Sequence, residues 1–91
     1  MGNQTERAVA VRYQPEKEDA PRLLASGQGE VARKILEIAR KHGVPAYSDP
    51  ELVEILGRFE PGTVIPEELY QVMAEVLAFI YRLNQKAGPK V

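Results

Sequence analysis

The longest periodic run of hydrophobic positions covers residues 65–85 and predicts a helix. Pro66 suits a first helical position, and Glu67 and Glu68 bring negative charge to the first turn, where the helix dipole favours it. The apolar positions of this helix occupy two adjoining sides. The first side holds Leu69, Val72, Met73, Val76, Ile80 and Leu83, and the second holds Tyr70, Ala74, Leu77 and Tyr81.

Together the two sides form an apolar arc of roughly 220°, which is wider than the ~100° stripe that one core contact needs. Two explanations are open. The rest of a small domain wraps around the helix, or the second side lines a shallow apolar recess that accepts a partner.

Two strands are predicted before the first helix. Residues 8–13 alternate, with Val9, Val11 and Tyr13 on one side and small alanines on the other, so that the alanine side can lie under a helix. Residues 22–26 form a short apolar run that is either a second strand or a lead-in to the next helix. A charged, proline-bounded loop, residues 14–21, connects the two and ends in the less polar pair Ala20 and Pro21.

The middle of the chain predicts a strand–helix–strand unit. Residues 30–41 form an amphipathic helix whose buried stripe comprises Val31, Ile35, Ile38 and Ala39, and Gly43 ends it. The short apolar run 44–47 then reads as a return to a strand, parallel to 22–26 through a right-handed crossover. A second helix over residues 50–59 follows, with Ser48 or Asp49 as its cap and Pro50 at its first position.

These elements predict a small mixed α/β domain, with a thin mixed sheet of about three short strands packed against three helices, the last of them long. Residues 8–85 form the domain, residues 1–7 a flexible N-terminal segment, and residues 86–91 a flexible tail. Ninety-one residues with 44% hydrophobic and 27% charged positions suit one small globular core.

Charge and composition narrow the function. A formal net charge of −1 does not favour nucleic acid as a partner, and the tyrosines do not alternate with basic residues as they would on an RNA-binding surface. The chain has no cysteine, no apolar run of ~20 residues and no signal-peptide pattern, so that a cytoplasmic protein is expected.

Catalytic and metal-binding residues are not apparent. His42 is the single histidine, and it falls on the buried stripe of the first helix at its last turn. A metal site would need carboxylates alone, and only Ser26 and Ser48 could serve as serine nucleophiles. Gly27-Gln28-Gly29 precedes a helix but lacks the rest of a phosphate-binding fingerprint, so it predicts a strand-to-helix turn. We therefore expect a binding or structural module without cofactor or metal rather than an enzyme.

Several segments taken together resemble a known family. They are AVAVRY at 8–13, the PEK and AP parts of the following loop, the Gly27/Gly29 pair with its helix, and IPEELY at 65–70 running into AEVLA at 74–78. This combination, spread over nearly the whole chain, resembles the C-terminal cytoplasmic domain of the FlhB family, the export-gate proteins of bacterial flagellar type III secretion. It is most similar to stand-alone FlhB-like proteins that lack the membrane part.

The sequence departs from the family at one motif, which aligns with residues 3–6. Family members carry an Asn-Pro-Thr-His motif whose Asn attacks its own carbonyl, so that the chain cleaves itself between Asn and Pro. The aligned residues here are Asn3, Gln4, Thr5 and Glu6. Proline and histidine are both replaced, and the strand that precedes the motif in the family has no counterpart in the sequence, so we expect no self-cleavage.

The family implies a role in docking export substrates and in switching from rod and hook substrates to filament substrates. Its proposed docking surface, carried over by position, comprises Ala20, Pro21, Ala74 and Leu77. Rod- and hook-class substrates and export-gate membrane proteins are the implied partners, and the membrane is reached only through them. An alternative is a structural module whose first strand completes a truncated membrane FlhB. A weak homodimer through that strand is a third arrangement.

Overall fold

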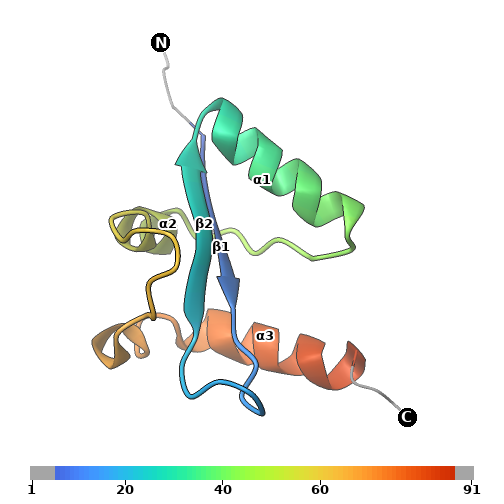
Figure 1. The fold of residues 1–91 in the computed structure, drawn as a ribbon, viewed down its shortest axis with the longest axis vertical. Coiled ribbons are helices and arrows are strands. Elements are labelled where there is room, and N and C mark those ends of the chain that lie inside the picture. Colours follow the sequence, from blue (N-terminus) through green and yellow to red (C-terminus); the bar gives the residue numbers. More distant parts are fainter. Residues whose placement is uncertain (1–5, 88–91) are drawn as a thin grey trace.

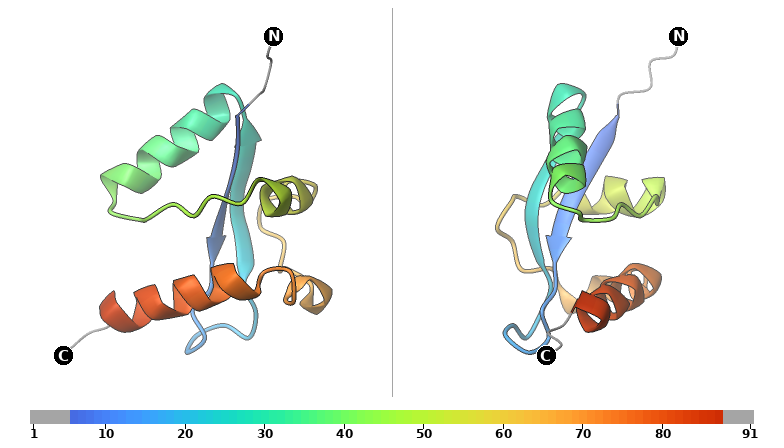
Figure 2. Two further views of the ribbon diagram at one scale, coloured as in Figure 1. Left: turned by 180° about the vertical axis from the view of Figure 1, so that it is seen from behind. Right: turned by 90° about the vertical axis from the view of Figure 1, so that its right-hand side faces the viewer.

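The structure is a computed structural model that describes residues 6–87. Its elements follow the chain as β1 (Arg7–Arg12), β2 (Arg22–Gln28), α1 (Glu30–Lys41), α2 (Pro50–Leu56), the short 3₁₀ helix η1 (Glu67–Leu69) and α3 (Ala74–Ala87). Figures 1 and 2 show the two strands as a long hairpin, with α1 on its upper half, α2 at mid-height and α3 across its lower end. The mixed α/β class with three α-helices is confirmed.

The sheet differs from the expected one. β1 and β2 pair antiparallel, with a register shift between Ala10 and Val11 that leaves Leu24 as the extra residue of a bulge. The expected parallel strand at 44–47 is wrong, because those residues belong to no strand. Within the described residues the sheet therefore has two strands, and the crossover unit does not form.

Another segment occupies the free edge of β2. The backbone N–H of Leu23 donates to the carbonyl of Thr63 at 2.9 Å, and the N–H of Gly62 donates to the carbonyl of Leu23 at 2.7 Å. Val64 forms an isolated antiparallel bridge with Arg22. Residues 62–65 thus take the place that the sequence pattern assigned to 44–47, where Pro45 lacks a donor and Val44 already donates to the carbonyl of Ala39 at 2.8 Å.

The two faces of the hairpin have different partners. Val9 and Val11 pack against a buried cluster made of Leu23, Leu52, Leu56, Ile65 and Met73. By alternation Ala8 faces the other way, where it is buried beneath α1 together with Ala32. The expectation that the alanine side would lie under a helix is confirmed.

α1 buries a narrower face than expected. Ala32 is fully buried and Ile35 and Ala39 are half-buried, whereas Val31 and Ile38 are each 53% exposed. Small side chains on both the helix and the strands let α1 approach the sheet closely, so the larger side chains are left on its flank. Their assignment to the buried stripe was wrong.

The second helix ends earlier and the last helix begins later than expected. Asp49 caps α2 by accepting the N–H of Leu52 at 3.1 Å, and Pro50 is its first residue, but α2 stops at Leu56. The predicted helix 65–85 is interrupted: Pro66 is extended, with ψ 148°, and η1 and a turn precede α3. The reason is that Ile65 donates its N–H to the carbonyl of Pro21 at 2.9 Å and is buried in the core, which holds the chain extended at that point.

Candidate functional site

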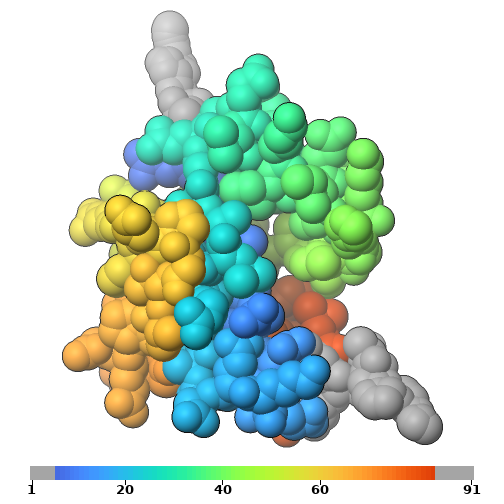
Figure 3. All heavy atoms as spheres, viewed as in Figure 1, coloured from blue at the N-terminus to red at the C-terminus, as the bar shows by residue number. Residues whose placement is uncertain are grey.

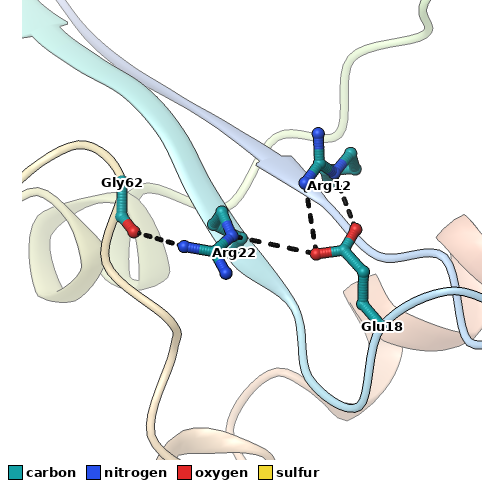
Figure 4. A network of polar contacts seen from close by, with 4 residues as sticks. All are labelled: Arg12, Glu18, Arg22 and Gly62. Atoms are coloured by element: carbon teal, nitrogen blue, oxygen red, sulfur yellow. Dashed lines mark hydrogen bonds and ion pairs between the residues drawn. The ribbon is translucent and has the colours of Figure 1, made fainter.

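The hairpin loop that carries Ala20 and Pro21 is held by a polar network (Figure 4). Arg12 and Arg22 are direct partners in the strand register, so that two positive charges stand opposite each other. Glu18 accepts hydrogen bonds from Nε and Nη2 of Arg12 at 2.7 and 3.2 Å and lies 3.8 Å from Nε of Arg22. Arg22 in turn donates to the carbonyl of Gly62 at 2.8 Å. The loop is thereby joined to both strands and to the segment beside β2.

Glu18 titrates below an ordinary glutamate. The hydrogen bond from Arg12 is the main cause that lowers its pKa, with the charges of Arg12 and Arg22 adding to it against partial desolvation. The same pair raises the pKa of Arg12 above its ordinary value. The carboxylate form of Glu18 is therefore the one that the folded loop stabilises.

Glu18→Gln is expected to lower the free energy of unfolding at neutral pH but not in strong acid. Because the folded chain lowers the pKa of Glu18, its contribution is complete above the ordinary glutamate pKa of about 4.3 and is lost as the pH falls through the lowered folded pKa. Urea midpoints of the wild type and the variant should differ at pH 7 and converge as the pH falls below the lowered pKa of Glu18. Glu16→Gln, in the same loop and exposed, is the matched control. A Glu18→Gln difference that persists unchanged at low pH would contradict this account.

The four residues of the expected recess differ in accessibility. Pro21 is fully buried and Ala20 is half-buried, at the end of the hairpin loop. Ala74, the first residue of α3, is exposed, and Leu77 is half-buried against the core cluster. Figures 1 and 2 place the hairpin loop beside the first turns of α3.

A series of contacts connects Pro21, at the end of the loop, to Leu77 on α3. The carbonyl of Pro21 accepts the N–H of Ile65, and Ile65 shares the core cluster with Met73. The carbonyl of Met73 accepts the N–H of Leu77 at 2.8 Å, one helical turn further on. The loop end and the start of α3 are thus fixed to the same part of the core.

The second apolar side of the last helix is divided. Tyr70 precedes α3, is half-buried and packs on the core cluster, and its burial raises the pKa of its hydroxyl. Tyr81 is 49% exposed on α3. The first explanation of the wide apolar arc therefore holds for Tyr70, which belongs to the core. Ala74 and Tyr81 are exposed, and for them the partner-binding recess stays a prediction.

Tyr47 makes a contact with α3 that the sequence did not predict. The hydroxyl of Tyr47 donates to Oε1 of Glu75 at 2.7 Å, which raises the tyrosine pKa. The rings of Tyr47 and Phe79 lie 5.3 Å apart between centroids, tilted by 52°. Tyr47 belongs to the segment that connects α1 and α2, and its partners are about thirty residues away, so no local pattern could reveal the pair.

The glycine pair and the histidine have structural positions. Gly29 precedes α1 with φ 59°, and its N–H donates to the carbonyl of Glu6 at 2.7 Å, which is the strand-to-helix turn that was expected. His42 is the C-terminal cap of α1 and is exposed. Its placement on a buried stripe was wrong. Among residues 6–87, no three His, Asp or Glu side chains gather so as to hold a metal ion.

The degenerate motif falls at the edge of the structure. Asn3, Gln4 and Thr5 lie outside the described residues. Glu6 is exposed, and its Oε1 lies 3.3 Å from Nε of Arg33 on α1.

The described elements reach close to the expected ends of the domain. β1 begins at Arg7 and α3 extends to Ala87, while residues 88–91 of the expected tail lie outside the described residues. In the described part of the chain, no helix has the length and apolar character to cross a membrane.

Known proteins resemble this chain in sequence and in fold. The chain is 42% identical over 84 residues to the uncharacterized protein YlqH of Bacillus subtilis, covering 92% of this chain and 90% of that protein. It is 39% identical over 85 residues to the flagellar biosynthetic protein FlhB of Aquifex aeolicus, of which it spans only 24% of the length.

A solved structure agrees with both relatives. The cytoplasmic domain of FlhB from Shewanella putrefaciens is 36% identical, with a TM-score of 0.75, over 90% of this chain and 64% of that one. The family model described as the FlhB HrpN YscU SpaS family matches residues 1–80. The chain therefore belongs to the FlhB family of flagellar and type III export proteins.

Proposed function

We propose that this chain is a cytoplasmic component or accessory of a type III protein export apparatus, and that it binds export substrates or export-gate partners through the surface of Ala20, Ala74 and Leu77, behind which the buried Pro21 anchors the loop end. Membership of the FlhB family supports the first part. The observation that carries the second is the accessibility of Ala74 at the start of α3, beside a loop end anchored to the same core.

The chemistry of this surface suits a small apolar anchor. Alanine side chains beside a half-buried leucine leave room for one side chain of a peptide, and burial of a single apolar anchor is a common source of binding energy. The proposal assigns this surface a binding role and no catalytic role.

Ala74→Asp is expected to weaken peptide binding at least tenfold while the fold persists. Ala74 is exposed and is the first residue of α3, where a carboxylate is favourable to the helix dipole, so the change should act on binding alone. The measurement is an NMR titration of the ¹⁵N-labelled chain with peptides from rod- and hook-class export substrates. Shifts should centre on the amides of Ala20, Ala74 and Leu77.

Ala78→Asp is the matched control, because it places the same charge on an exposed alanine one turn further along α3. It should leave the affinity unchanged. Leu77→Asp is less informative, since Leu77 packs against the core cluster and its loss also affects folding. Equal binding by wild type and Ala74→Asp, or no shifts at millimolar peptide, would refute the docking surface.

The second candidate is a structural module that completes a membrane-embedded FlhB through strand pairing. It is favoured by β1, which pairs only with β2 and whose outer edge has no backbone partner among residues 6–87. Under this function, adding a purified FlhB that is truncated before its C-terminal cytoplasmic domain should slow amide hydrogen exchange in β1, at residues such as Val9 and Val11. Self-pairing of this edge would instead appear as a dimer in light scattering of the chain alone.

A further inference from the structure

α1 leaves one flank uncovered. Its contacts with other elements are to β1 and β2. Ala32 is fully buried and Ile35 and Ala39 are half-buried, while the side chain of Val31 lies against Gly27 of β2 and stays 53% exposed. Figures 1 and 3 show the helix at the surface, on the upper right of the molecule, with no other element over its outer side.

Four residues on that flank form a single line along the helix. They are Val31, Lys34, Ile38 and Lys41, and we call them the α1 row. Their spacing of three and four residues places them on neighbouring turns of one helix face. Val31 and Ile38 are each 53% exposed, so apolar and basic side chains alternate along an accessible edge.

The two lysines of the row lie one turn from Glu30 and Glu37 on the same helix. In the described part of the chain neither Lys34 nor Lys41 forms an ion pair. The other flank of α1 differs: Leu36 lies there in a shallow hollow with Arg33, Glu37 and Arg40, and Arg33 is already engaged by Glu6 at 3.3 Å and Glu30 at 3.7 Å. The α1 row places two exposed aliphatic side chains and two lysines that form no ion pair on one edge of the helix.

We propose that the α1 row binds an acidic amphipathic helix of a partner protein. Two aliphatic side chains one repeat apart offer a seam for the apolar face of such a helix, and its carboxylates would pair with Lys34 and Lys41 on the same edge. This surface lies on a different helix from the Ala74 surface, and the inference does not depend on the proposed function.

Two other occupants fit the row less well. A second copy would place the lysines of both chains in one small interface without supplying the carboxylates of an acidic partner on the facing row. A lipid surface would gain little, because the row has no aromatic side chain to insert. A single helix against four side chains makes a small interface, so the complex is expected to be weak and salt-sensitive.

The test uses two synthetic helical peptides that share one leucine pattern, with glutamates flanking it in the first and lysines in the second. Titrated into the ¹⁵N-labelled chain at low salt, the acidic peptide should shift the amides of residues 31–41, and the basic peptide should not. Ile38→Ala should weaken the acidic peptide at least fivefold, whereas Leu36→Ala, on the other flank, should not.

Charge reversal makes the test specific. The double variant Lys34→Glu/Lys41→Glu should lose the acidic peptide and gain the basic one, with circular dichroism showing the helix content unchanged. Equal binding of both peptides, no binding at millimolar concentration, or shifts outside α1 would overturn the proposal. So would equally strong binding to phosphatidylglycerol vesicles, or a dimer in sedimentation equilibrium that Ile38→Ala dissolves.

Discussion

Leu23→Ala is expected to lower the free energy of unfolding by about 2–5 kcal/mol, the range typical of leucine truncation in a packed core. Leu23 is 0% exposed and contacts the cluster that joins β2, α2 and the entry to α3. Its backbone also pairs with residues 62 and 63, so the cavity lies where three parts of the chain meet and cannot close easily. Small domains have ~5–15 kcal/mol in total, so the urea midpoint should fall sharply.

Leu24→Ala is the control for that experiment. The neighbouring leucine is the extra residue of the bulge and is 45% exposed, so the same chemical change should alter stability by about 0.5 kcal/mol or less. Urea unfolding of both variants, followed by circular dichroism because the chain has no tryptophan, measures the difference. Similar losses for the two leucines would show that the core is not organised around Leu23.

Gly27→Ala is expected to destabilise the domain by about 1–3 kcal/mol through overpacking. A Cβ at this position would overlap Cγ1 of Val31 and lie 2.7 Å from Cβ of the same residue. The atom at 2.7 Å is attached to the helix backbone, so rotation of the valine side chain cannot relieve the whole clash. α1 would have to move away from the strands, and thermal or urea unfolding should report the loss.

Two comparisons identify the clash as the cause. In the double variant Gly27→Ala/Val31→Ala the closest atom is gone while the Cβ contact remains, so part of the loss should be recovered, and a double-mutant cycle measures the coupling. Gln28→Ala, at the next position and exposed, should be nearly neutral. A neutral Gly27→Ala would mean that α1 does not approach the sheet as closely as described.

Local signals predicted the elements whose causes lie within a few residues. Asp49 and Pro50 mark the start of α2, the glycine pair marks the turn into α1, and the alternation of residues 8–13 gives both faces of β1. The sequence showed that the charged loop 14–21 ends in a less polar pair. It did not predict the ion-pair network that holds this loop, because Arg12, Glu18 and Arg22 come together only when the hairpin aligns the two arginines.

The sequence by itself determined the class of the domain, the start of α2, the alanine face of β1 that lies under a helix and, through its resemblance, the family. Tertiary structure decided which segment lies beside β2, because the backbone groups of Leu23 bond to residues 62 and 63, forty positions away. It also decided where α3 begins and that Val31 and Ile38 stay exposed. Periodicity shows that a side chain is apolar, whereas burial depends on how closely another element can approach, and only the packed chain sets that distance.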